Sequence, residues 1–126
     1  MFTRRDFHSC SLGLFLMLLL GTAPALAHHG WAWTESENTE LTGTITSVRL
    51  GNPHGRLTVA VDGKEWLVEV GQPWRNTQAG LTDELLSEGR KITVIGQSSA
   101  DPDELRLKAE RVLIDGKEYV LYPERD

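Results

Sequence analysis

The sequence has almost no cysteine, because Cys10 is the only one among its 126 residues. A disulfide within the chain and a zinc centre built from several thiolates are both excluded. A long apolar run is also missing, since the longest one, residues 12–20, falls well short of the roughly 20 residues that a membrane-spanning helix needs. There is no glycine-rich phosphate loop of the P-loop or dinucleotide-binding type.

Positive charge is in the minority. The chain has 13 Lys and Arg residues against 18 Asp and Glu residues, a formal net charge of −5. An acidic protein is repelled by the phosphate backbones of DNA and RNA. The composition therefore predicts a protein that does not bind nucleic acid.

The first residues follow the order of an export signal. The pair Arg4-Arg5 precedes the apolar run 12–20, and Ala25-Leu26-Ala27 follows it as a cleavage site. The paired arginines are typical of a twin-arginine signal. We expect residues 1–27 to be removed after Ala27 and the mature protein to be periplasmic or secreted, with no stable membrane anchor. The alternative, an uncleaved anchor, is disfavoured by the short apolar run.

The remaining chain divides into a leader, residues 28–39, and one domain, residues 40–126. In residues 40–50, apolar or small residues alternate with threonines, as in a β-strand. Gly43, together with a change in the phase of this alternation after Ile45, predicts a bent or bulged strand. Two further alternating runs flank Asp62-Gly63 and predict a hairpin, and Asp115-Gly116 predicts a second one.

Residues 72–89 interrupt the strand pattern. Pro73 and Gly80 predict a short helix between them, and Thr82 predicts the N-cap of a second one that ends at Gly89. Strand character returns over residues 90–97 and 105–114. We expect Trp66 and Trp74 to fill the core on hydrophobic grounds.

This order of elements predicts a mainly β fold. A long bent strand, a hairpin, a short helical insertion and a final hairpin suit a small, partly open β-barrel of the OB type. The alternative is a β-sandwich of two sheets.

Three stretches give the mature chain a family resemblance. The first, "HHGW", follows the signal directly. The second, "LTGTITSVRLGNPHGRLTV", contains the turn Asn52-Pro53-His54. The third, "GRKITVIGQSSADPDELRLKAERVLIDGK", contains the strand regions 90–97 and 105–114. Together they resemble a bacterial exported family known as domain of unknown function 6152. The resemblance implies export and a small β domain, and it implies no particular reaction.

Three histidines lie beyond the predicted cleavage site, namely His28, His29 and His54. Cleavage after Ala27 would give His28 a free α-amine, which can chelate a metal together with the imidazole ring. A further imidazole would complete a nitrogen site suited to copper, while zinc would need a fourth ligand. The alternative is a solvated chain end and a histidine that only hydrogen-bonds its turn.

Such a site requires the leader to fold back. Residues 40–50 would span about 36 Å if straight, and His54 lies beyond their far end. The leader reaches at most about 40 Å. Trp31 and Trp33 could hold it against the barrel, or could anchor a partner, and Asn52 and Pro53 would join them in contacting a ligand or partner.

No nucleophile–base or acid–base constellation stands out, so we predict a protein that is not an enzyme. The preferred hypothesis is an exported binding domain that captures a ligand or metal with the leader histidines and the Asn-Pro-His turn. One alternative is a periplasmic copper-handling or metalloenzyme accessory protein. The other is a protein-interaction module anchored by Trp31 and Trp33.

Overall fold

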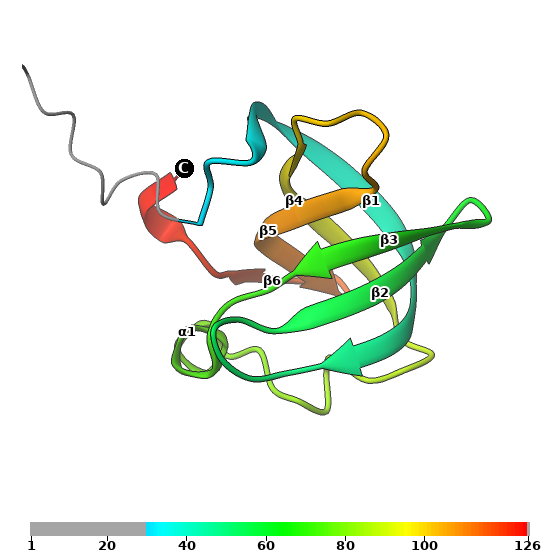
Figure 1. Ribbon diagram of the computed structural model, residues 1–126. Helices are drawn as coiled ribbons and strands as arrows, with labels where there is room; N and C mark the ends of the chain where they lie inside the picture. The colour runs from blue at the N-terminus through cyan, green and yellow to red at the C-terminus, as the bar shows by residue number, and fades with distance from the viewer. Residues whose placement is uncertain (1–29, 126) are drawn as a thin grey trace, which may run out of the picture.

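The computed structural model describes residues 30–125, and these form a β-barrel with one short helix (Figure 1). The elements in chain order are β1 (Thr34–Arg49), β2 (Arg56–Val61), β3 (Lys64–Glu69), α1 (Pro73–Ala79), β4 (Lys91–Ser99), β5 (Arg106–Ile114), β6 (Lys117–Val120) and the 3-10 helix η2 (Pro123–Arg125). The predicted signal peptide, residues 1–27, lies outside the described residues. No helix within residues 30–125 is long and apolar enough to cross a membrane.

Strand β1 is shared between two neighbours, which makes it the bent strand that the sequence predicts. Its first part pairs antiparallel with β4, through Thr44↔Lys91, and its last part pairs with β2, through Arg49↔Arg56. The register shifts between Ile45 and Ser47, where the strand carries a bulge. A bulge bends and twists a strand, so β1 can turn from one side of the barrel to the other.

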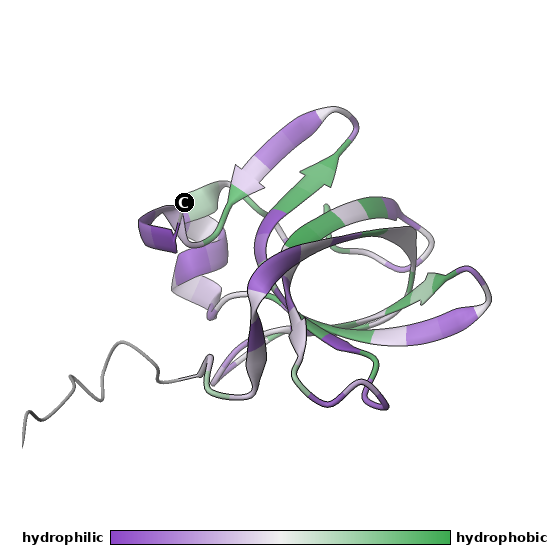
Figure 2. Ribbon diagram, turned by 90° about the horizontal axis from the view of Figure 1, so that it is seen from above, coloured by the Kyte–Doolittle hydropathy of each residue, from purple (hydrophilic) through white to green (hydrophobic). Residues whose placement is uncertain are grey.

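The ring of strands closes between β3 and β5, which pair in parallel through Leu67↔Arg106 and Val68↔Leu107. The order around the ring is β1, β2, β3, β5 and β4, and β6 extends it as a hairpin on β5. Figure 2 looks into this ring from above. The ring confirms the predicted OB-like barrel and not the sandwich.

The core fills the ring with side chains from every strand of it and from the segment after α1. Its fully buried members include Ile45, Leu57, Val68, Leu86, Val94, Leu107 and Val112. Trp66 packs against this core while partly buried. The prediction for Trp74 is wrong, since this residue on α1 is 56% exposed.

One predicted boundary and one predicted helix differ from the structure. Strand β1 begins at Thr34, so residues 34–39 of the predicted leader are part of the strand. A second helix does not form after Thr82, because this segment makes turns and its backbone then bonds to the barrel, with Gly89 N donating to the Ile45 carbonyl at 2.8 Å. Burial of Leu81 and Leu86 holds these turns under the barrel.

Both predicted hairpin turns are confirmed. Asp62 and Gly63 have φ values of 49° and 79°, and Asp115 and Gly116 have values of 51° and 78°. Two consecutive positive φ values are typical of the type I′ turn that suits a two-residue hairpin.

Gly96 is required where β4 and β5 approach each other. A Cβ at this position would lie 1.9 Å from the Lys108 carbonyl oxygen, and the register of the two strands shifts between Ile95 and Gly96. We expect Gly96→Ala to lower the free energy of unfolding by about 1–3 kcal/mol, because backbone must move to admit the methyl group. Chemical denaturation measures this, with Ser98→Ala on the same strand as the control. An unchanged free energy in Gly96→Ala would show that the strands separate freely there.

Candidate functional site

The outer surface of β5 is covered by both ends of the described chain. The alternation of the strand directs Leu107 and Ala109 into the barrel and Lys108 and Glu110 outward. Yet Lys108 is only 3% exposed and Glu110 only 1%. Residues 30–33 and helix η2 lie over this surface, next to each other in Figure 1. A buried charge is costly unless it is paired or hydrogen-bonded, so the partners of these two residues are informative.

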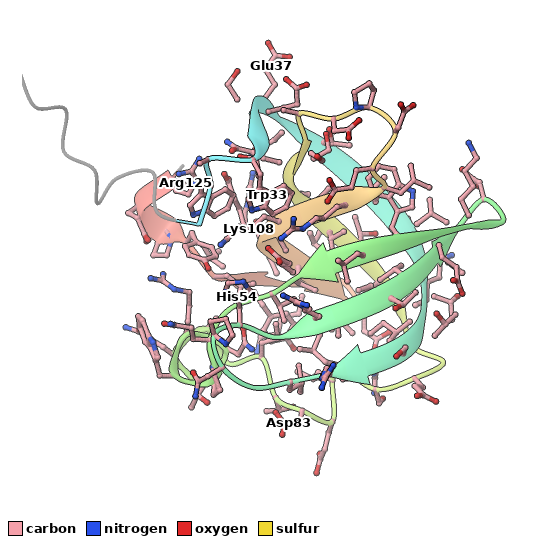
Figure 3. The ribbon with its side chains drawn as sticks, in the orientation of Figure 1. Trp33, Glu37, His54, Asp83, Lys108 and Arg125 are labelled. Carbon is pink, nitrogen blue, oxygen red and sulfur yellow. The ribbon has the colours of Figure 1, made fainter. Side chains whose placement is uncertain are left out.

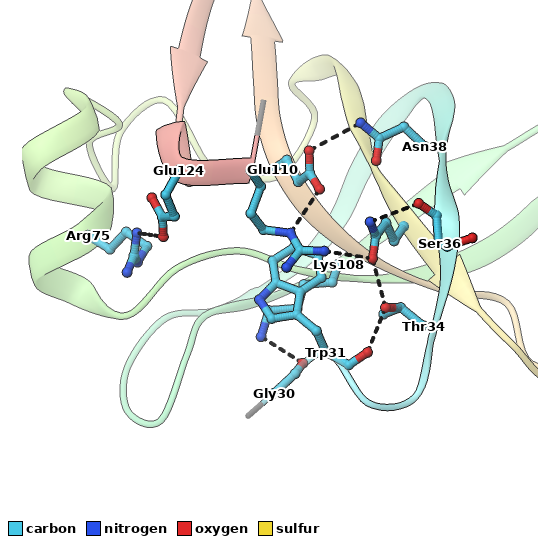
Figure 4. Close-up of polar contacts among 11 residues, drawn as sticks. Gly30, Trp31, Thr34, Ser36, Asn38, Arg75, Lys108, Glu110 and Glu124 are labelled. Carbon is cyan, nitrogen blue, oxygen red and sulfur yellow. Dashed lines mark hydrogen bonds and ion pairs between the residues drawn. The ribbon is translucent and has the colours of Figure 1, made fainter. Parts of the chain in front are cut away.

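Glu110 is fully partnered (Figure 4). Arg125 Nε donates to one carboxylate oxygen at 3.1 Å, and Asn38 Nδ2 donates to the other at 3.1 Å. The Arg125 guanidinium also donates to Gln97 Oε1 at 3.1 Å. These bonds fix helix η2 to β4 and β5 and join β1 to β5, and their role is structural.

Lys108 has far fewer partners. Its Nζ donates to the Gly30 carbonyl at 3.0 Å, and no carboxylate of the described residues pairs with it. The ammonium also lies 4.9 Å from the centre of the Trp31 ring. Burial lowers the pKa of Lys108, and the positive charges of Arg106, Arg125 and Arg75 lower it further, although the negative charge of Glu69 acts the other way.

Glu69 is the buried carboxylate nearest to the predicted turn. Its side chain is 1% exposed, and Arg106 Nη2 donates to Oε1 at 2.7 Å. His54 Nε2 lies 3.6 Å from the same oxygen and Arg56 Nε lies at 4.0 Å. Burial lowers the pKa of Arg106, but the hydrogen bond and charge of Glu69 outweigh this, so the net pKa is raised. Glu69 Oε2 has no hydrogen-bond partner within the described residues.

Aromatic rings and cations alternate over this surface. The Arg106 guanidinium lies 3.8 Å from the centre of the Trp33 ring, and that of Arg125 lies 3.9 Å from the centre of the Trp31 ring. Trp31 meets Tyr122 edge to face at 5.1 Å. Stacking of this kind stabilises a contact by about 0.5–2 kcal/mol. The tryptophans therefore hold the leader onto the barrel, as the sequence allowed.

A cavity of about 510 Å³ opens beside Lys108, and we call it the leader cavity. It is lined by Gly30, Trp31, Pro53, His54, Gln72, Arg75, Lys108 and Tyr122. Figure 3 shows Lys108 and His54 on the same side of the barrel. Leader and turn thus meet, because bent β1 returns the chain to the side from which it started.

The structure brings together only some of the predicted site residues. Trp31, Pro53 and His54 line the leader cavity, whereas Asn52 is exposed and lines a smaller cavity of about 220 Å³ with Pro53 and His54. Trp33 lines neither and stacks on Arg106 instead.

The predicted metal ligands His28 and His29 lie outside the described residues. Within residues 30–125, no group of three or more His, Cys, Asp or Glu side chains could hold a metal ion.

Sequence reasoning missed Lys108, Arg75, Gln72 and Tyr122. Lys108 sits at an outward position of an alternating strand, which predicts a solvated side chain. Its cover comes from Gly30 and Trp31, far away in the sequence, and no local pattern reports such a contact. The one local signal is the aromatic ring of Tyr122, which lies in the segment that follows the predicted turn Asp115-Gly116.

One family model covers most of the chain. The model of a family of unknown function (DUF6152) matches residues 17–107. No curated protein matches the chain.

Among solved structures, a chain of the Stn1–Ten1 complex of S. pombe has a TM-score of 0.50 at 18% identity, over 61% of this chain and 57% of that chain. TiaS in complex with a transfer RNA and ATP has a TM-score of 0.47 at 16% identity, over 61% of this chain and 18% of that chain. The ZRD-deleted mutant of TiaS with agmatine has 0.48 at 16%, over 67% and 26%. The chain thus spans little more than half of the Stn1–Ten1 chain, and this likeness supports the OB-like fold alone.

Glu69 should contribute to stability through Arg106. Glu69→Gln keeps the shape of the side chain and removes the charge that the guanidinium faces. We expect the free energy of unfolding to fall by about 2 kcal/mol, which is less than the usual loss for a fully buried pair because Arg106 is a quarter exposed. Chemical denaturation measures the loss, and Glu65→Gln, an exposed position on the same strand, should change little. Equal effects in the two variants would contradict a role for the buried pair.

The lowered pKa of Lys108 predicts a pH dependence of stability. Between that pKa and the ordinary value of 10.5, the unfolded chain binds more protons than the folded one. The free energy of unfolding should therefore rise with pH through this window, and below it the cost of the buried ammonium is fully present. Burial raises the pKa of Tyr122, which acts in the opposite direction once the pH passes 10.0.

Denaturation at a series of pH values from about 7 to 9.5 tests this below the range of Tyr122. The unfolding free energy should rise in the wild type and stay flatter in Lys108→Met. Lys64→Met, exposed at the tip of the β2–β3 hairpin, is the control and should follow the wild type. Parallel curves for wild type and Lys108→Met would contradict the assignment.

Proposed function

The chain belongs to the DUF6152 family of unknown function, and for it we propose the role of an exported binding domain that captures a small ligand in the leader cavity. The observation on which this rests is that one cavity joins Trp31 of the leader to Pro53 and His54 of the turn, beside buried Lys108. Its volume of about 510 Å³ falls among those of known ligand pockets, about 300–1,000 Å³.

The cavity favours binding over catalysis. No Ser, Thr, Cys, Asp or Glu of the described residues lines it. Among the described residues, the wall therefore has no serine, threonine or cysteine nucleophile and no carboxylate that could act as an acid or base. Aromatic rings and hydrogen-bond donors line it instead, and walls of this kind are usual in sites that hold and orient an organic molecule.

Export is part of the same proposal and rests on the sequence of residues 1–27. The paired arginines, the short apolar run and Ala25-Leu26-Ala27 support cleavage after Ala27 and a periplasmic or secreted protein. The net charge of −5 supports a ligand other than nucleic acid.

A second candidate is copper handling, and one observation favours it. Gly30 lines the same cavity as His54, and His28 and His29 directly precede Gly30 in the sequence. Two residues span about 7 Å at most, so an amino-terminal chelate at His28 could share a metal with His54. Glu69, 3.6 Å from His54 Nε2, would orient the imidazole as a carboxylate does behind a metal ligand. The charges of Lys108 and Arg75 in the cavity oppose a cation, so we place this candidate second.

NMR titration of the protein that starts at His28 tests both candidates. The titrants are a panel of small anionic, cationic and neutral organic fragments, followed by Cu(II). We expect at least one fragment to shift the Trp31 indole N–H signal, and we expect His54→Ala to weaken that binding several-fold. Asp83→Ala is the control, because this exposed residue follows α1 and lines neither cavity at the turn.

Two results would decide against these proposals. If no fragment shifts the signals of the cavity residues, the leader cavity is not a ligand site. If Cu(II) binds equally well to a protein with one extra residue before His28, the amino-terminal chelate is wrong.

A further inference from the structure

We infer that the ligand of the leader cavity is an organic anion, whose charged group is bound by Lys108 and Arg75 and whose body lies against Trp31 and Tyr122. This rests on the proposed function, and it names the class of ligand. Lys108 lies on β5 and Arg75 on α1, so it is the fold that brings them to the cavity beside the leader and the Asn-Pro-His turn.

The charges around the cavity have one sign. Arg75 and Lys108 line it as cations, and no acidic side chain of the described residues is part of its wall. This is unusual in a chain of net charge −5. The nearest carboxylates are already paired, Glu69 with Arg106 and Glu124 with Arg75. A ligand that brings its own negative charge would offset the repulsion between the cations.

Lys108 has hydrogen-bonding capacity to spare. An ammonium has three donors, and here the described residues accept one of them, at the Gly30 carbonyl. Glu110, two residues along the same strand and as deeply buried, has a partner on each oxygen. Because a buried charge is costly when it is left unpaired, the open donors of Lys108 are the ones a bound anion would satisfy.

Arg75 lines the same cavity but comes from helix α1 and not from β5. Its hydrogen bonds to the Leu121 carbonyl, at 2.9 Å, and to Glu124, at 3.3 Å, both leave from Nη1. The guanidinium lies 4.1 Å from the centre of the Tyr122 ring, and Lys108 Nζ lies 5.8 Å from it. Both cations thus lie near one ring and line the same cavity, so a carboxylate bound there could accept hydrogen bonds from both.

The aromatic walls indicate an organic body. Trp31 and Tyr122 are each half-buried and meet edge to face at 5.1 Å, so they offer apolar surface next to the cations. Apolar and aromatic walls with few polar groups are the usual lining of sites for organic ligands. At about 510 Å³, the cavity is also far larger than an inorganic oxyanion needs.

Matched probes test the class of ligand. Phenylacetate and phenylacetamide have the same ring and differ in charge, and inorganic phosphate has charge without a ring. Binding is followed by NMR through the Trp31 indole N–H and the ε-methylene group of Lys108. We expect phenylacetate to bind at least about ten times more tightly than phenylacetamide, and we expect phosphate to bind more weakly than phenylacetate.

Two variants locate the effect. Lys108→Met should reduce the preference for phenylacetate over phenylacetamide to nearly none, while Lys64→Met, with the same change of net charge, should leave it intact. Bound phenylacetate should also raise the pKa of Lys108, which a merely structural lysine would not show.

The outcomes separate the two proposals. If phenylacetamide binds in the cavity as tightly as phenylacetate, the leader cavity remains a ligand site and the anionic class is wrong. If phosphate binds as tightly as phenylacetate, the cavity attracts any anion and the organic body is wrong. If neither aromatic probe shifts the cavity signals while a cationic or neutral member of the fragment panel does, only this inference fails. If nothing at all binds there, the proposed function fails with it.

Discussion

Burial of Lys108 and Glu110 on the outer surface of β5 is the constraint that organises both ends of the described chain. Two charges cannot leave water without partners, and most of those partners come from the two ends of the described chain. Arg125 and Asn38 bind Glu110, while the Gly30 carbonyl and the ring of Trp31 meet Lys108. The leader therefore lies against β5, and the space left between it and the turn is the leader cavity.

This arrangement depends in turn on the curvature of β1. A straight strand of 16 residues would separate its ends by about 53 Å, and the leader would then lie far from the turn. The bulge after Ile45 and the close strand contacts at Gly43 and Gly96 close the barrel instead. The same curvature that buries the core thus also places Trp31 and His54 at one cavity.

The sequence predicts those features that are local. The alternation of residues 57–61, the Asp-Gly turns and the slip in β1 each follow from a few neighbouring residues, and the structure confirms them. The large apolar ring of Trp74 predicts a core position, but the hydrogen bond of its indole to Gln72 and its contact with Arg75 keep it on the surface of a one-helix insertion. Lys108 could not be recognised, because its environment is made by residues distant in the sequence. His54 can be identified, since a histidine in a turn is a candidate ligand in any fold.

Lys108 and Glu110 differ in how their buried charges are partnered, although they lie close together on one strand. They are two residues apart on one strand, both point out of the barrel, and both are buried beneath the same cover. Both oxygens of Glu110 are bonded, which is the pattern of a structural ion pair, whereas Lys108 keeps open donors beside a cavity and has no carboxylate partner within residues 30–125. If burial of charge served only to hold the leader, an apolar side chain at position 108 would do so at lower cost. The open donors of Lys108 therefore support the proposal that this residue binds a ligand, and its positive charge favours an anion.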